Sequence, residues 1–82
     1  MTDGEGMLLL VFDSIHDVVR AERLLLAAGI PCDLLPTPHD VSSDCGMVVA
    51  CDAAHEEAVR DLAAGGRLAW RNLVRRDAAG RR

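Results

Sequence analysis

The sequence predicts an α+β domain, and three observations support that fold class. Four short apolar segments and two longer amphipathic segments follow one another in the order strand, helix, strand, strand, helix, strand. Glycine and proline residues separate most of these segments. The chain has 82 residues, of which 50% are hydrophobic, so we expect one small domain with a thin core.

The first half of the chain contains two predicted strands and the helix between them. The continuous apolar run over 7–12 suits a buried strand. Ser14 then occupies the position of a helix N-cap, with Asp17 three residues later. We expect this helix to end where Gly29 allows the chain to turn, and the second strand to cover 31–35.

The second half repeats this pattern with a strand, a helix and a strand. Residues 46–51 form the third predicted strand, and Asp52 is expected to cap a second helix over 53–64. A weaker alternation over 68–73 indicates the fourth strand. This order is that of a ferredoxin-like βαββαβ sandwich, in which two helices cover one face of a four-stranded antiparallel sheet.

We expect a flexible N-terminus at 1–6, a single domain over 7–74 and a disordered, arginine-rich tail at 75–82. The charge supports this division. Residues 1–66 contain twelve acidic residues and three arginines, whereas residues 67–82 contain six arginines and one aspartate, for a net charge of -4.

The same composition excludes several classes of function. Nucleic-acid binding is not expected, because the body of the domain is acidic and Phe12 and Trp70 are its only aromatic residues. The chain has no lysine, which excludes Schiff-base chemistry by a lysine side chain. It has neither a long apolar run nor a signal-peptide pattern, so we expect no membrane association. Three cysteines cannot all pair within one chain, which favours a cytoplasmic protein with free thiols.

The segment that follows the second predicted strand is the strongest candidate site. Its two prolines stiffen the backbone, its short polar side chains can bond loop amides, and its glycine permits close approach to the preceding cysteine, Cys45. Cys45 is therefore the candidate catalytic residue. The supporting loop residues are Pro36, Thr37, Pro38, His39, Ser42, Ser43, Asp44 and Gly46. The sequence leaves open the alternative of a structured turn with an incidental cysteine.

The predicted topology suggests accessory residues for Cys45. The start of the first helix, the proline loop and the turn before Arg67 should share one end of the sheet, which places Cys45 near Ser14, where unpaired helix amides favour a thiolate. His16 or His39 could exchange a proton with Cys45, and Arg67 could steady an anion. For each of these side chains, simple solvent exposure is the commoner case.

Val18, Val19, Leu25 and Leu26 form an apolar arc on the first predicted helix, which we expect to face the sheet. Glu22 falls inside this arc. A buried carboxylate has to find amide donors or an arginine, keep its proton or reach solvent at the helix edge. We expect a structural partner for Glu22. Glu22 lies about two turns after the start of the helix, and this distance from the predicted site makes contact with Cys45 doubtful.

Cys32 and Cys51 are predicted on neighbouring strands, where they could approach each other, and we favour their interpretation as small core residues. Cys45 and Cys51 should be too far apart along one strand for a disulfide. The sequence has no Cys-x-x-Cys pair and its cysteines fall on different elements, so a zinc site is not expected. We predict no cofactor.

Parts of the chain resemble the selenium/sulfur carrier protein-like family, a group of small domains formerly of unknown function. The resemblance covers about 7–62 and rests on four short motifs. They read Ala28-Gly29-Ile30-Pro31, Pro36-Thr37-Pro38, Ser42-Ser43 and Cys45-Gly46. The resemblance implies the ferredoxin-like fold and a role for Cys45 in carrying sulfur or selenium. His39-Asp40 stands where the family often has a basic–acidic pair, and the arginine-rich tail has no counterpart.

Together these inferences predict a protein that holds a persulfide or selenosulfide on Cys45. Its partners would be a sulfur-donating protein, such as a cysteine desulfurase or sulfurtransferase, and an acceptor enzyme. Two alternatives stay open. One is a small regulatory or scaffolding domain, and the other is a thiol enzyme that uses Cys45 with a nearby histidine. The sequence does not indicate the oligomeric state.

Overall fold

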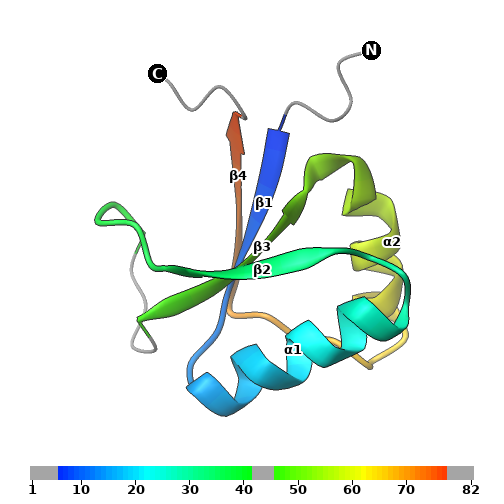
Figure 1. Cartoon of the computed structure of the whole chain (residues 1–82). Helices are drawn as coiled ribbons and strands as arrows, with labels where there is room; N and C mark the ends of the chain where they lie inside the picture. The colour runs from blue at the N-terminus through cyan, green and yellow to red at the C-terminus, as the bar shows by residue number, and fades with distance from the viewer. Residues whose placement is uncertain (1–5, 42–45, 78–82) are drawn as a thin grey trace.

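The computed structural model describes residues 6–41 and 46–77 (Figure 1). The elements in chain order are β1 (Gly6–Val11), α1 (Ile15–Ala27), β2 (Cys32–Pro36), β3 (Met47–Asp52), the short 3-10 helix η2 (Ala53–His55), α2 (Glu56–Ala64) and β4 (Asn72–Asp77). The strands form one antiparallel sheet in the order β2-β3-β1-β4. With two helices packed on one face, this confirms the predicted ferredoxin-like α+β fold.

The predicted helix caps are present. The Ser14 hydroxyl accepts a hydrogen bond from the Asp17 amide at 3.3 Å, and the Asp52 carboxylate accepts one from the Ala54 amide at 2.9 Å. Gly29 follows α1 with a φ of 82°, a conformation that favours glycine. The first turn of the second predicted helix is the 3-10 helix η2, and α2 itself begins at Glu56.

The strands bury side chains on both faces of the sheet, which explains the unbroken apolar run of β1. One face packs against the helices. Its main buried residues are Leu8, Leu10 and Val49 from the strands with Val18, Ala21, Leu25 and Val59 from the helices. The opposite face is covered by no helix, yet it also contains a buried cluster. That cluster consists of Leu9, Val11, Val41, Val48 and Ala50.

The fourth strand lies further along the chain than the alternation over 68–73 predicted. Leu68 is 5% exposed and packs into the helix-face core, but it belongs to the connection that precedes β4. The strand itself is Asn72–Asp77, and its register places Met7 opposite Arg76. It therefore extends into the segment that the sequence assigned to the tail. β4 forms an edge of the sheet, where charged side chains are readily accommodated.

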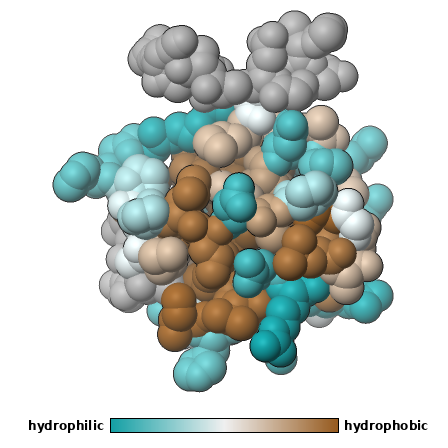
Figure 2. Space-filling view, viewed as in Figure 1, coloured by the Kyte–Doolittle hydropathy of each residue, from teal (hydrophilic) through white to brown (hydrophobic). Residues whose placement is uncertain are grey.

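Helix α1 is rotated relative to the arc predicted from its apolar residues. Val18, Ala21 and Leu25 face the core. Three other apolar residues remain at the surface, with exposed fractions of 47% for Ile15, 36% for Val19 and 52% for Leu26. Figure 2 shows apolar atoms gathered on the lower part of the molecule, where Figure 1 places this helix. The prediction that Val19 and Leu26 point at the sheet was wrong, because α1 carries more apolar residues than it can bury.

Candidate functional site

One end of the sheet brings together the segments that the sequence assigned to the site. The register places the end of β1 beside the starts of β3 and β4, with Val11 opposite both Val48 and Asn72. The end of β2 lies at the same place, since Pro36 is opposite Met47. Helix α1 also begins here, a few residues after β1. The predicted meeting of helix start and proline-loop base at one end of the sheet is confirmed.

The base of the proline loop is closed by a backbone hydrogen bond. The Thr37 amide donates to the Gly46 carbonyl at 3.0 Å, which extends the β2–β3 ladder by one residue pair. Gly46 has a φ of 82°, and a Cβ atom built on it would meet nothing within 4 Å. Backbone conformation, rather than crowding, therefore accounts for glycine at this position. The Thr37 hydroxyl oxygen is enclosed and has no hydrogen-bond partner in the described part of the chain.

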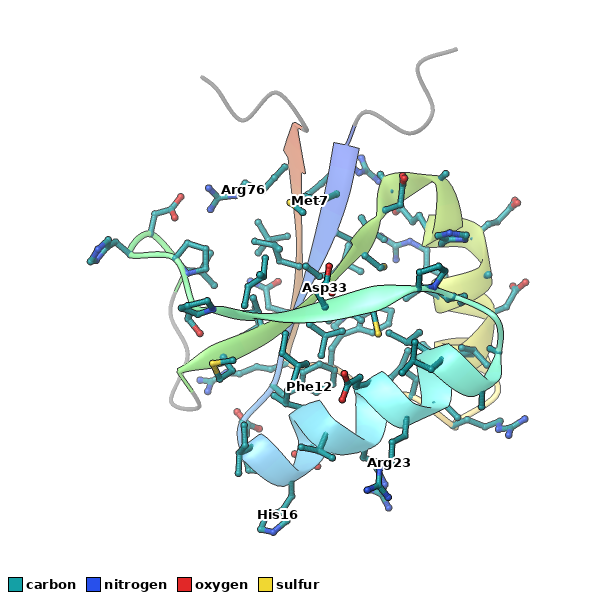
Figure 3. All side chains as sticks on the ribbon, viewed as in Figure 1. Met7, Phe12, His16, Arg23, Asp33 and Arg76 are labelled. Atoms are coloured by element: carbon teal, nitrogen blue, oxygen red, sulfur yellow. The ribbon has the colours of Figure 1, made fainter. Side chains whose placement is uncertain are left out.

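The turn that follows Thr37 folds back over the face of the sheet that the helices leave uncovered. The Val41 amide donates to the Pro38 carbonyl at 3.0 Å, and the Val41 side chain is 8% exposed within the second apolar cluster. Asp40 accepts a hydrogen bond from Arg76 of β4 at 2.6 Å, and Figure 3 shows Arg76 extending toward this turn. That hydrogen bond is the main reason that the pKa of Asp40 is lowered. The sequence did not indicate this contact.

Four of the predicted loop residues lie outside the described residues. They are Ser42, Ser43, Asp44 and Cys45. Their described neighbours differ in surroundings, because Val41 is buried on the uncovered face whereas Gly46 is exposed at the base of the loop. The proximity of Cys45 to the first turn of α1 stays a prediction.

The candidate accessory residues Ser14, His16 and His39 lie on two different sides of the sheet. Ser14 uses its hydroxyl as the N-cap of α1. His16 is exposed on α1 and points away from the sheet in Figure 3. His39 is exposed in the turn that covers the opposite face, between Pro38 and Asp40. The fold therefore does not bring the two histidines together.

Arg67 lines a cleft between α1 and the connection that leads to β4. The cleft has a volume of about 310 Å³, and Arg20, Trp70 and Asp17 also line it. Arg71 donates to the Asp13 carboxylate at 2.8 Å across the same region. The cleft thus carries charges of both signs. Sequence reasoning selected Arg67 but missed Arg20 and Trp70, because their proximity depends on how α1 packs against a loop far along the chain.

Three arginines of the basic segment 67–82 are ion-paired within the domain. Arg71 pairs with Asp13, Arg76 with Asp40, and Arg75 with Glu56, which also accepts a hydrogen bond from Arg60. The hydrogen bonds from Arg75 and Arg60 lower the pKa of the Glu56 carboxyl. These pairs join β4 to the loop after β1, to α2 and to the proline turn. Arg75 and Arg76, which the sequence assigned to the tail, therefore contact the body of the domain.

Glu22 lies at the edge of α1 rather than under it. The described part of the chain contains no fully buried polar or charged residue, and Glu22 is half-buried without an ion-pair partner there. It reaches solvent at the helix edge, so the expected structural partner is absent from the described residues. Its backbone carbonyl accepts a weak hydrogen bond from the Cys32 thiol at 3.9 Å. Glu22 thus contacts the first residue of β2 through its backbone carbonyl.

Cys32 and Cys51 stand directly opposite each other in the β2–β3 register. Both side chains contact the helix-face core, where Cys51 is 4% exposed and Cys32 is half-buried. Burial, followed by the nearby charges of Glu22 and Asp33, raises the pKa of the Cys32 thiol. Burial, followed by Cys32 and Asp52, raises the pKa of Cys51 to about 11. Their expected role as small core residues agrees with this packing.

Two kinds of feature do not occur in residues 6–41 and 46–77. Neither helix has the length and apolar character needed to cross a membrane. No three side chains of His, Cys, Asp or Glu gather there in an arrangement that could hold a metal ion.

Comparison with known proteins identifies the family. No curated protein and no solved structure matches the chain. The family model described as Putative Se/S carrier protein-like matches residues 7–75. This range contains both helices and all of the sheet except Gly6, Arg76 and Asp77. The match also spans the proline loop, with Cys45 and Gly46 inside it. The chain therefore belongs to the Putative Se/S carrier protein-like family.

Proposed function

We propose that the protein carries sulfur or selenium on Cys45 and relays it between a donor protein and an acceptor enzyme. The observation that supports this most strongly is the family match, because it covers 7–75 and contains the Cys45-Gly46 pair. The donor would be a cysteine desulfurase or another sulfurtransferase. Cys45 would hold the cargo as a persulfide or a selenosulfide.

The properties of the other two cysteines favour Cys45 by elimination. A thiol that accepts sulfur has to ionise and to meet a donor protein at the surface. Cys51 is buried with a pKa of about 11, and the pKa of half-buried Cys32 is also raised. Neither thiol meets both requirements. Cys45 is not excluded on these grounds, and it directly precedes the exposed Gly46 in the sequence.

The proposed transfer consists of two nucleophilic displacements. The Cys45 thiolate attacks the terminal sulfur of the donor's persulfide, a new S–S bond forms, and the donor's thiolate leaves and takes up a proton. A nucleophile of the acceptor then attacks the terminal sulfur on Cys45, and Cys45 leaves as a thiolate. No electrons are gained or lost overall, so the carrier needs no cofactor for this step.

Loading of the full chain tests the proposal. We expect incubation with a cysteine desulfurase and cysteine to add one sulfur atom to the protein, detected by intact mass spectrometry. Cys45→Ser should abolish the addition, whereas Cys32→Ser and Cys51→Ser should retain it. Absence of loading would favour a scaffolding domain instead. Turnover of a sulfur compound without an acceptor protein would favour a thiol enzyme.

A further inference from the structure

The β2–β3 ladder determines what kind of cross-strand pair Cys32 and Cys51 form. Residues directly opposite each other in an antiparallel ladder alternate between hydrogen-bonded and non-hydrogen-bonded pairs. The Thr37 amide donates to the Gly46 carbonyl, and these two residues continue the register in which Pro36 is opposite Met47. Thr37 and Gly46 are therefore a hydrogen-bonded pair.

Counting back along the ladder places the cysteines at a non-hydrogen-bonded position. Pro36 is one step from Thr37 and falls at a non-hydrogen-bonded position, which suits a residue without an N–H group. The register is unbroken from Pro36 to Cys32, so Cys32 and Cys51 occupy a position of the same kind. In such pairs the Cα atoms lie about 4.5 Å apart and the side chains approach most closely. A disulfide requires Cα atoms roughly 4.4–6.8 Å apart.

The two side chains also lie on the same face of the sheet. Both contact the apolar cluster beneath the helices, and Cys32 is one of the groups that raises the pKa of Cys51. Closing an S–S bond between them therefore requires neither a change of strand register nor rotation of either side chain to the other face. The Cys32 thiol would give up only its weak hydrogen bond to the Glu22 carbonyl.

A small oxidant can reach Cys32 from the surface, because this residue begins β2, an edge strand of the sheet. Cys32 is half-buried, whereas Cys51 is almost fully buried. Cys32 is therefore the thiol that meets the oxidant, and Cys51 lies behind it.

We propose that Cys32 and Cys51 form a dithiol–disulfide redox site that is separate from Cys45. Cys51 lies five positions after Gly46, which corresponds to about 16 Å along an extended strand. The site thus lies at the opposite end of the sheet from the base of the proline loop. The proposal concerns a different pair of thiols from those of the sulfur-carrier proposal and does not depend on it.

The oxidation is a two-step exchange with a low-molecular-weight disulfide such as oxidised glutathione. The Cys32 thiolate attacks one sulfur of glutathione disulfide, the S–S bond breaks, and one glutathione leaves as a thiolate. Cys51 then loses its proton and attacks the Cys32 sulfur, and the second glutathione leaves. Both leaving thiolates take up the protons that the cysteines release. The protein loses two electrons and two protons, and one glutathione disulfide becomes two glutathione molecules.

The electrostatics predict that this exchange is slow at neutral pH. Burial opposes ionisation of both thiols, as do the charges that face them: Glu22 from α1 and Asp33 from β2 act on Cys32, and Asp52 at the end of β3 acts on Cys51. Replacing Glu22 by glutamine removes one of these charges without changing the shape of the side chain. It should raise the rate of oxidation several-fold.

The test uses the full chain with Cys45→Ser, so that every remaining thiol belongs to the pair. The variant is equilibrated with reduced and oxidised glutathione at fixed ratios, then acid-quenched, unfolded, alkylated and weighed intact. We expect a monomer that has lost two hydrogen atoms and takes up no alkylating agent. In reduced glutathione alone, both thiols should be free and should each take up one alkyl group. The additional change Cys32→Ser should leave one thiol that cannot form an internal bond.

Three results would overturn the proposal. They are a lasting glutathione adduct on Cys32, disulfide-linked dimers in place of the oxidised monomer, and two free thiols even in fully oxidised glutathione. Circular dichroism of each variant checks that the fold is retained. Glu22→Gln measures the expected acceleration, and Glu57→Gln on α2 is the matched control, because Glu57 is exposed and is not among the charges acting on either cysteine.

Discussion

The two ends of β3 (Met47–Asp52) offer very different surroundings to a thiol. At one end, Gly46 is exposed with a φ of 82° and closes a loop through its bond to Thr37. At the other end, Cys51 is 4% exposed and its pKa is raised to about 11. The difference teaches that a thiol inside this ladder is kept protonated. We therefore expect a readily ionised thiol only beyond this ladder, and Cys45, which precedes Gly46 in the sequence, is the candidate.

The largest expected effect is a difference in the alkylation rates of Cys45 and Cys51. At pH 7 a thiol with a pKa of about 11 has roughly 300-fold less thiolate than an ordinary thiol of pKa about 8.5. We therefore expect iodoacetamide to label Cys45 at least 100-fold faster than Cys51 in the folded protein, measured by peptide mapping over time. Labelling of Cys51 should rise with pH up to about its raised pKa. Equal labelling of all three cysteines would contradict the comparison.

The next effect tests how firmly the proline turn is attached to the uncovered face of the sheet. Val41 is 8% exposed, so Val41→Ala should lower the free energy of unfolding by about 1–3 kcal/mol through lost apolar contact and a residual cavity. Urea denaturation measures the change. The matched control is Val19→Ala, because Val19 is 36% exposed on α1 and alanine favours helix. A Val41 variant as stable as the Val19 variant would mean that the turn contributes nothing to the core.

A smaller effect concerns Glu22, whose backbone carbonyl accepts the hydrogen bond from the Cys32 thiol. Glu22 is half-buried without an ion pair in the described residues, so Glu22→Ala should change the free energy of unfolding by no more than about 0.5 kcal/mol. The same variant should lower the pKa of Cys32, because the Glu22 charge is one of the causes that raise it. Ultraviolet absorbance of the thiolate against pH, in a variant that retains only Cys32, measures this shift. A large loss of stability would reveal a partner for Glu22.

The smallest effect concerns the ion pair that links the proline turn to β4. Asp40→Asn should weaken the contact with Arg76 and reduce hydrogen-exchange protection of the Val41 amide. The lowered pKa of Asp40 means that this stabilisation is present above the ordinary aspartate pKa and is lost as pH falls through the lower, folded value. The difference in stability between the unsubstituted protein and the Asp40→Asn variant should therefore shrink below about pH 4. A difference independent of pH would exclude a charge effect.

Much of the fold could be predicted because its signals are local. Ser14 and Asp52 cap helices through side chains that act on neighbouring amides, and Gly29 ends α1 through its own backbone. The fourth strand was placed too early, because Leu68 continues the apolar alternation although it anchors a loop. Nothing local distinguishes a loop anchor from a strand residue when both are apolar and buried.

The candidate site was less predictable because its geometry depends on distant contacts. Two prolines and Gly46 indicated a built loop, but Asp40 meets Arg76 across 36 residues of sequence. Val41, a single apolar residue among polar ones, was the available signal that the turn packs against the sheet. The facing of Cys32 and Cys51 depended on the register of the ladder, and a slip of one residue would have sent their side chains to opposite faces.

The pairing of β4 with β1 sets the order in which the chain can fold. Gly6 stands opposite Asp77, so this ladder joins residues from the two ends of the described chain. The β2–β3 ladder, in contrast, closes over one short loop and can form early. Until residues 72–77 join the sheet, β1 can pair only with β3, and its other edge stays unpaired. β4 therefore does more than complete the sheet, because it also closes an apolar strand edge that could otherwise pair with a wrong strand.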